Sequence, residues 1–261
     1  MQVFQVDAFT NKPFGGNPAA VCIIEEEKPD KWLQNFAAEM NLSETAFIRK
    51  EQEGYNLRWF TPKNEEELCG HATLASAHVL WETGLLKLKN EAVFNTKSGV
   101  LTAKKSGEWI YINLPSEPPE EAEAPKSLIE GLGVEPVYTG KNRLDYIVEI
   151  KSEEVLRELQ PNMEKLKQVN TRGIIVTSKT NSSKYDFISR FFAPDLGINE
   201  DPVTGSAHCC LAPYWAKSMR KYKFMAYQAS PRGGELKVNL IEDRVVLGGE
   251  SITVMEGKVV V

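Results

Sequence analysis

Apolar and polar residues alternate along much of the first half of the chain, as they do in β-strands. Runs of this kind, bounded by Gly, Pro or Asn, predict strands at residues 2–9, 19–24, 45–48, 55–60 and, with a turn at Ser106-Gly107, 92–114. Between them, Asp30 is the expected N-cap of a helix that Asn41 closes. The apolar residues of this helix fall on one face: Trp32, Leu33, Phe36, Ala37 and Met40.

A second helix, predicted from His71 to Glu82 and stopped by Gly84, has a different pattern. Its apolar residues occur nearly all round: Ala72, Leu74, Ala75, Ala77, Val79 and Leu80. A helix that is apolar on most sides is buried on most sides. We expect this helix, and another over 206–220, each to be central to its half of the chain.

The segment PSEPPEEAEAPK, residues 115–126, is rich in Pro and Glu and is the best candidate for a linker. It divides the chain into an expected domain of residues 1–116 and another of residues 117–261, from which the last strand can return to the first. Within the second domain the pattern predicts strands at 146–150, 173–178 and 186–193, a helix at 152–167, and short strands over 235–261.

The second half of the chain repeats the first. Three pairs of segments match in the same order: Asn41 with Asn170, RWFTP at 58–62 with RFFAP at 190–194, and CGHA at 69–72 with TGSA at 204–207. Their offsets are 129, 132 and 135 residues. Ordered matches with slowly growing offsets indicate a duplication, in which each half holds a strand, a loop, a glycine and a central helix.

The duplication places Gly70 and Gly205 just before the starts of the two central helices. Glycine lets backbone N–H groups approach a ligand closely, and a helix N-terminus offers unpaired donors at the positive end of its dipole. Two such ends facing one cleft would suit an anionic substrate. The alternative is that both glycines belong to ordinary helix caps.

Glu44 lies between the end of the first helix and an apolar strand, in the segment MNLSETAF, where partial burial is expected. Its repeat partner is Gly173, so the carboxyl group is present in one half only. A carboxyl group in apolar surroundings can both take up and release a proton near neutral pH. A surface glutamate that caps a turn is the alternative.

His71, Asp201 and Ser206 are the other candidates. His71 sits in the first turn of a buried helix, where the helix dipole disfavours a charged ring, so a neutral imidazole could donate to a substrate oxygen; a structural histidine is the alternative. Asp201 precedes the second central helix and could orient a partner or cap the turn. Ser206 lies opposite His71, at a position typical of an N-cap.

Composition excludes several classes of function. The chain has 31 Lys and Arg against 36 Asp and Glu, a net charge of -5, and no dense basic run, which argues against nucleic acid as a partner. No apolar run is long enough for a membrane span, and the N-terminus MQVFQVDAFT lacks the features of a signal peptide. With adjacent Cys209 and Cys210 a disulfide framework is disfavoured, so reduced thiols and a cytoplasmic location are expected.

Cofactor motifs are also missing from the sequence. The chain has 3 histidines, and Cys69-Gly70-His71 has no second spaced pair of ligands, so a metal site is disfavoured. The glycines spell neither a dinucleotide fingerprint nor a P-loop, and no G-x-S-x-G elbow occurs.

Several long motifs together closely resemble the phenazine-biosynthesis F (PhzF-like) family and cover most of the chain: VDAFTNKPFGGNPAAV, NLSETAF, RWFTP with LCGHATLASAHVL, and FFAPDLGINEDPVTGSAH followed by LAPYW. The resemblance implies an α+β, diaminopimelate-epimerase-like fold. In that fold two pseudo-symmetric domains each wrap a mixed sheet or barrel around a central helix, with the active site between them. It also implies a homodimer.

The resemblance further implies an isomerase that works without metal or organic cofactor. In the family's phenazine enzyme, a glutamate shuttles a proton during isomerisation of a dihydro-hydroxyanthranilate. The family's catalytic positions, in the NLSET, CGHAT and EDPVTGS motifs, fall on Glu44, His71, Asp201 and Ser206 of this chain, and its substrate-contacting glycines on Gly70 and Gly205. The expected substrate is a small cyclic or amino-acid-like carboxylate.

One departure and two alternatives stay open. Before Cys69 the family usually has an aliphatic residue between two acids, whereas this chain has Glu65-Glu66-Glu67, which leaves the substrate preference undefined. The fold also carries two-thiol racemases and epimerases; Cys69 stands in the place of one thiol, but its repeat partner Thr204 cannot act as a second base. A binding or scaffold protein that keeps the fold without turnover is the remaining alternative.

Overall fold

The computed structural model describes residues 1–260 and divides the chain into two compact units. The first unit comprises residues 1–114 together with the segment from 246 onward, and the second comprises residues 115–245. In the described part of the chain, no helix is long and apolar enough to cross a membrane.

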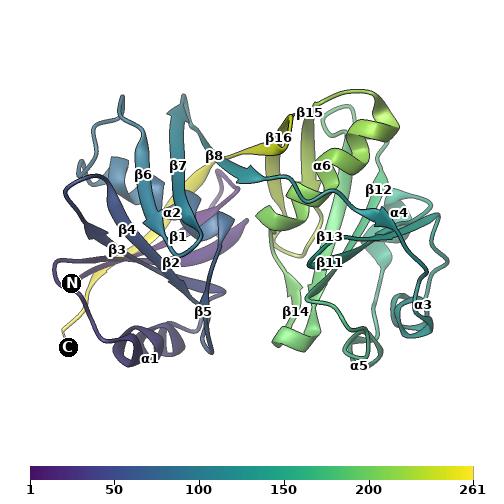
Figure 1. The fold of residues 1–261 in the computed structure, drawn as a ribbon, viewed down its shortest axis with the longest axis horizontal. Helices are drawn as coiled ribbons and strands as arrows, with labels where there is room; N and C mark the ends of the chain where they lie inside the picture. The colour runs from purple at the N-terminus through teal and green to yellow at the C-terminus, as the bar shows by residue number, and fades with distance from the viewer. Residues whose placement is uncertain (261) are drawn as a thin grey trace. The chain divides into compact units, whose positions relative to one another are not determined.

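The first unit is a mixed sheet with two helices. Its elements in chain order are β1 (Gln2–Ala8), β2 (Asn17–Ile24), α1 (Asp30–Met40), β3 (Glu44–Lys50), β4 (Tyr55–Phe60), β5 (Glu65–Glu66), α2 (Gly70–Glu82), β6 (Ala92–Thr96), β7 (Gly99–Ser106), β8 (Trp109–Pro115) and, after β17 (Arg244–Gly249), β18 (Ser251–Lys258). β18 pairs antiparallel with β1, so the last strand completes this unit. Met1 and the segment after β18 lie together beside it (Figure 1), where the Val259 N–H donates to the Met1 carbonyl.

The second unit has the same kind of architecture. Its elements are β9 (Glu120–Glu121), α3 (Lys126–Leu132), β10 (Tyr138–Lys141), β11 (Asp145–Glu149), α4 (Glu153–Glu158), α5 (Met163–Leu166), β12 (Gly173–Lys179), β13 (Phe187–Ala193), a 3-10 turn at Pro194–Leu196, β14 (Ile198–Asp201), α6 (Gly205–Met219), β15 (Lys223–Gln228) and β16 (Gly234–Ile241).

The strands of the two units pair in the same order. In the first unit β1–β2 is antiparallel, β2–β3 parallel, β3–β4 antiparallel, β4–β6 parallel and β6–β7 antiparallel. In the second, β10–β11, β11–β12, β12–β13, β13–β15 and β15–β16 repeat those five directions. The small strands β5 and β14 pair antiparallel with β4 and β13. This common order is consistent with a duplicated unit.

The residue registers repeat as well. Thr45 pairs with Phe60 on β3–β4, and Ile174 pairs with Phe192 on β12–β13, which are the offsets of 129 and 132 found in the sequence. Trp59 pairs with Glu66, and Phe191 with Asp201, which gives the offset of 135. The register of a sheet is set by which side chains must face the core. Both units therefore use one packing scheme.

The central helices are buried nearly all round, as their apolar pattern predicts. α2 packs against β1, β2, β3 and β18, and ten of its residues are buried: His71, Ala72, Thr73, Leu74, Ala75, Ser76, Ala77, Val79, Leu80 and Trp81. α6 is similar, and its N-terminal half is almost entirely buried. Because most of the surface of these helices is shielded from water, their buried polar groups must find partners inside each unit.

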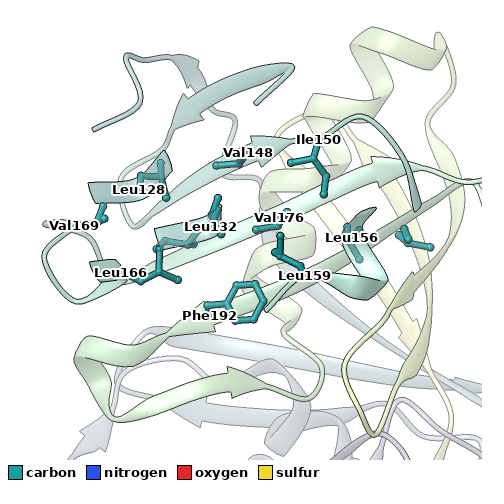
Figure 2. Close-up of a cluster of buried hydrophobic side chains, with 12 residues drawn as sticks. Leu128, Leu132, Val148, Ile150, Leu156, Leu159, Leu166, Val169, Val176 and Phe192 are labelled. Carbon is teal, nitrogen blue, oxygen red and sulfur yellow. The ribbon is translucent and has the colours of Figure 1, made fainter. Parts of the chain in front are cut away.

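Outer helices cover the other face of each sheet. In the first unit α1 lies along the outside of the strands (Figure 1), and its Leu33 and Ala37 join a cluster with Phe47 and Phe60. In the second unit, α3, α4 and α5 set Leu128, Leu132, Leu156 and Leu166 against Val148, Val176 and Phe192 of the sheet (Figure 2). Helices this short are unstable alone, so packing holds them; each fully buried Leu contributes about 1.5–3 kcal/mol.

Three expectations from the sequence need correction. The helix expected at 152–167 is two short helices, because Pro161 has no N–H and forces the residue before it out of helical geometry; Ser152 and Asn162 each cap one piece. Asp30 is not a side-chain cap; it pairs with Arg58 instead. The segment 115–126 begins where the two units divide, as expected of the linker candidate, but it is part of the second unit: it contains β9 and is hydrogen-bonded to β10 and to the carbonyl of Cys209.

Candidate active site

Glu44 is the first residue of β3, and the turn before it aims its side chain inward. α1 ends at Asn41, which takes the left-handed conformation (φ 49°) and donates its N–H to the Ala37 carbonyl at 3.1 Å. Asparagine tolerates this conformation better than other side chains. Parallel pairing with β2 then sets Glu44 opposite Ala19, and its side chain is only 14% exposed.

His71 is the second residue of α2 and forms a buried pair with Glu44. Its Nε2 lies 3.0 Å from the Glu44 carboxylate, and its side chain is 6% exposed. Burial opposes a charge on the ring, but the Cys69 sulfur and the Glu44 carboxylate favour it and together hold the pKa of His71 above its ordinary value. The contact with Glu44 thus works against the helix dipole, which by itself favours a neutral ring.

The other ring nitrogen of His71 faces two further side chains. Nδ1 lies 3.3 Å from the amide nitrogen of Asn17 and 3.6 Å from Cys69 Sγ. Burial, followed by the charge of Glu44, raises the pKa of the Cys69 thiol. Cys69 is therefore protonated at neutral pH and is a poor base. Asn17 is a site residue that the sequence analysis did not single out, although it begins a strand directly after a glycine-rich loop.

Glu44, Cys69 and His71 also form the cluster in the described residues that could hold a metal ion, with one donor atom from each within 4.8 Å of the others. Each nitrogen of the imidazole already has a close neighbour, however: Nε2 lies 3.0 Å from the Glu44 carboxylate, and Nδ1 lies 3.3 Å from the amide nitrogen of Asn17. A bound ion would have to displace either Glu44 or Asn17 from the ring. The donor set therefore fits a proton-carrying pair better than a metal centre.

At the second helix start, Asp201 anchors the backbone. Its carboxylate accepts a hydrogen bond from the Thr204 hydroxyl, and its carbonyl accepts one from Gln228 Nε2 at 2.8 Å. Gln228 Oε1 in turn accepts the Thr204 N–H at 2.9 Å. These three residues fix the backbone immediately before Gly205, the first residue of α6. The carboxylate of Asp201 thus stabilises the turn before α6, and its role in catalysis stays a prediction.

Ser206 has a partner that the sequence did not reveal. Its Oγ accepts a hydrogen bond at 3.0 Å from Arg172, whose Nε also donates to Asp145 at 2.9 Å. The N-cap interpretation of Ser206 is wrong, because Thr204 occupies the cap position and Ser206 is the second helical residue. Arg172 lies next to Gly173, the repeat partner of Glu44, and only that position could have drawn attention to it.

The structure thus groups the six expected site residues in two sets. Glu44, Gly70 and His71 come together in the first unit, and the pair Glu44–His71 is in direct contact. Asp201, Gly205 and Ser206 lie within six residues of one another at the start of α6 in the second unit. All four cysteines are buried and unpaired.

Comparisons with known proteins agree with these features. A family described as phenazine biosynthesis-like protein matches residues 6–257. An uncharacterized isomerase of Halalkalibacterium halodurans is 57% identical over 257 residues, which is 98% of this chain and 97% of that protein. A crystal structure of a phenazine biosynthesis protein of the PhzF family from Enterococcus faecalis has a TM-score of 0.95 and 41% identity, and covers 100% of this chain and 99% of its own.

A more distant structure defines the fold more broadly. A Pseudomonas aeruginosa protein described as a predicted epimerase has a TM-score of 0.77 at 19% identity, and covers 100% of this chain and 99% of its own. At that identity the likeness concerns the fold alone. The α+β, epimerase-like fold expected from the sequence motifs is confirmed.

Proposed function

Because the chain belongs to the phenazine biosynthesis-like family and is an isomerase of that family, we propose that Glu44 takes a proton from one carbon of a small carboxylate substrate and returns it to another. The observation that carries this proposal is the buried contact of 3.0 Å between Glu44 and His71. A group that acts first as base and then as acid must be able to hold a proton in either step.

His71 makes both steps possible for Glu44. While Glu44 is a carboxylate, the imidazole stabilises its negative charge in a place that water hardly reaches. When Glu44 takes up the substrate proton, that charge disappears, and the ring then needs no counter-ion. Beside a neutral ring, the ionised carboxylate has an imidazole N–H 3.0 Å away, and the protonated carboxyl group leaves no buried charge in the pair.

Cys69 is not proposed as a base. Its sulfur faces the imidazole, its thiol has a raised pKa, and its counterpart in the second unit is Thr204. A two-thiol racemase needs a thiolate on each side of the reacting carbon. The described residues supply one buried thiol at these paired positions, which favours a shuttle by Glu44 over that alternative.

The second unit is proposed to hold the substrate's anionic group. This part of the proposal is supported by the sequence repeat and by the family, which assign substrate contacts to Gly70 and Gly205, and catalytic roles to Asp201 and Ser206. Gly205 and Ser206 begin α6, where backbone N–H groups are available to an anion. A homodimer remains a prediction, which light scattering on the purified protein tests.

The test uses a panel of small cyclic and amino-acid-like carboxylates incubated with the enzyme in deuterated water. Glu44→Gln keeps the shape of the side chain but cannot carry the proton, so its turnover should fall by roughly 10²–10⁴-fold. Glu117→Gln is the matched control. The Glu117 side chain is 19% exposed, a fraction similar to the 14% of Glu44, and it pairs with the exposed Arg143. If Glu44→Gln turned over within about threefold of the parent, less than any loss of a general base, Glu44 would be structural.

A further inference from the structure

The two nitrogens of His71 have different neighbours, and these restrict where the ring proton can lie. Nε2 is 3.0 Å from the carboxylate of Glu44, which in its ionised form can only accept a hydrogen bond. Nδ1 is 3.3 Å from Asn17 Nδ2, an amide nitrogen that can only donate. In a neutral ring, both contacts are favourable together only if the proton is on Nε2 and the lone pair is on Nδ1.

Cys69, the third neighbour, does not decide the position of this proton. Its sulfur is 3.6 Å from Nδ1, and a thiol is both a weak donor and a weak acceptor, so it can accompany either form of the ring. The amide of Asn17 has no such freedom while its nitrogen faces the imidazole. Asn17 is therefore the neighbour that distinguishes the two tautomers.

The backbone holds Asn17 in place for this role. Asn17 is fully buried at the start of β2, where it pairs with Ala8 of β1. The residue before it, Gly16, has a φ of +59°, and a Cβ there would lie 2.1 Å from the Ala8 carbonyl oxygen. Only glycine fits that approach. The chain thus enters β2 by one route, and Pro18 follows at once to limit rotation on the other side.

We propose that Asn17 is a positioning residue, which donates to Nδ1 and so holds neutral His71 with its proton on Nε2, the nitrogen beside Glu44. This inference rests on the proposed function and defines how the site is prepared for it. With the proton on Nε2, Glu44 meets a donor and is stabilised as a carboxylate, the form that accepts a proton from substrate. With the proton on Nδ1, a lone pair would face the carboxylate, and Glu44 would be driven to hold the proton itself.

His208 provides a built-in reference, because its surroundings require the opposite tautomer. Its Nδ1 lies 2.9 Å from the Thr204 carbonyl, which can only accept, so the proton of this ring is on Nδ1. Burial lowers the pKa of His208 to about 4, which keeps the ring neutral at pH 7. The chain has 3 histidines in all, so their ring signals can be assigned by single substitutions.

The experiment is nitrogen-15 NMR of the histidine rings in the full-length protein, recorded over a range of pH without substrate. Long-range proton–nitrogen correlations distinguish a protonated ring nitrogen from a bare one. In the parent protein, the neutral form of His71 should have a bare Nδ1 and a protonated Nε2, whereas His208 should show the reverse. Asn17→Ala should introduce the other tautomer of His71. Asn17→Asp, which can only accept at Nδ1, should keep both His71 nitrogens protonated to higher pH.

Asn95→Ala is the matched control. Asn95 also uses its amide nitrogen inside the first unit, where it donates to Glu51 at 2.8 Å, and its loss should leave the His71 signals unchanged. Unchanged signals of His78 and His208 in each variant show that the fold is intact. The proposal is overturned if parent His71 carries its proton on Nδ1, if both nitrogens stay protonated over the whole pH range of the folded protein, or if Asn17→Ala leaves the tautomer unchanged.

Turnover separates this inference from the proposed function. Once a substrate is identified, Asn17→Ala should lower kcat by about tenfold, a part of what general base catalysis contributes, with little change in KM. A bare Nδ1 in the parent, together with full activity of Glu44→Gln, would leave the geometry standing and refute the function. Loss of turnover in Glu44→Gln, together with a proton on Nδ1 of His71 in the parent, would support the proposed function and refute the role of Asn17.

Discussion

The start of β3 and the start of β12 occupy the same place in the two units, yet only the first carries a carboxylate of its own. Glu44 stands at the first, and Gly173 at the second. A Cβ at Gly173 would lie 2.1 Å from the Phe191 ring and 3.0 Å from the Asp145 carboxylate. In the second unit, Phe191 and Asp145 thus occupy the space that the first unit leaves for the side chain of Glu44.

The carboxylates near the two helix starts also have different partners. Asp145, which is buried, is held by the two-pronged guanidinium of Arg172, which keeps its charge at every pH that a folded protein experiences. Glu44 faces an imidazole, which can gain or lose a proton near neutral pH. The Asp145–Arg172 pair keeps its charges fixed, whereas the Glu44–His71 pair can gain or lose a proton. This difference is why we place the proton transfer in the first unit.

The framework around these positions is nevertheless the same. Arg58 Nε donates to Glu65 Oε1 at 2.7 Å, and Arg190 Nε donates to Glu200 Oε1 at the same distance. The first pair connects β4 to β5, the small strand before α2, and the second connects β13 to β14, the small strand before α6. The comparison teaches that a duplicated unit can retain its scaffold while the chemistry at one equivalent position diverges.

The largest expected effect is on this shared scaffold. Arg190 is 9% exposed and also donates to the carbonyls of Leu156 and Leu159 at the end of α4, so Arg190→Met should lower the free energy of unfolding by about 3–5 kcal/mol. Arg58 is 18% exposed, and Arg58→Met should cost about 1–2 kcal/mol. Urea unfolding measures both. If Arg58→Met lowered the free energy of unfolding as much as Arg190→Met or more, the Arg58–Glu65 and Arg190–Glu200 pairs would not differ as their burial indicates.

The next effect is a pH dependence that comes from the second unit. The pKa of His208 is about 4 in the folded protein, lowered by burial, against an ordinary value of 6.5. Between these values the unfolded chain binds a proton that the folded chain does not. Its contribution to stability is therefore full above pH 6.5 and falls by about 3 kcal/mol as the pH drops toward 4.

His71 has the opposite sign, because its pKa is raised. Its contribution is full below the ordinary pKa of histidine and is lost as the pH rises through the folded value. Urea unfolding from pH 7 downward, compared between the parent and His208→Gln, isolates the His208 contribution. Identical slopes in the two proteins would contradict the assignment.

A smaller effect concerns Gly173 itself. Gly173→Ala adds one methyl group against Phe191, a ring that is 5% exposed, and should lower the free energy of unfolding by about 1–3 kcal/mol. At the equivalent position of the first unit, Glu44→Ala removes atoms rather than adding them. Measured at a pH where the ring of His71 is neutral, so that no buried charge loses its partner, Glu44→Ala should reduce stability less than Gly173→Ala. Thermal unfolding of the two variants tests the order, and the reverse order would break the comparison.

The smallest effect is expected at Cys69. If Glu44 carries the proton, Cys69→Ala should change turnover by less than about threefold, below the contribution of a general base. The assay is the same deuterium exchange, with Cys22→Ala as a control, since Cys22 is also buried and lies away from His71 in β2. A Cys69→Ala variant as inactive as Glu44→Gln would restore the racemase alternative.

The sequence predicted the repeated elements best. The all-round apolar patterns located α2 and α6 to within one residue at each end, and the offsets of 129, 132 and 135 residues are those of the strand registers. Such features depend on local periodicity and on residues in fixed order. The break at Pro161 was also visible in the sequence, but the helical pattern on both sides obscured it.

Contacts between distant segments were beyond the sequence. Asn17 and His71 are 54 positions apart, and Arg172 and Ser206 are 34 apart. Neither pair leaves a local pattern, because His71 lies on α2, which packs against β2, and Ser206 lies on α6, a helix that tertiary packing brings to Arg172. The motif resemblance named His71 and Ser206 but did not indicate which side chains hold them.

The central claim is that the first unit alone carries the proton, through Glu44. Its most direct test is the rate at which deuterium from solvent enters a turned-over carboxylate, measured by NMR for the parent and for Glu44→Gln. We predict that exchange and turnover fall together in Glu44→Gln by roughly 10²–10⁴-fold, while a fold check by thermal unfolding shows an intact protein. Exchange by Glu44→Gln at the parent's rate would contradict the claim and move the proton carrier to another residue.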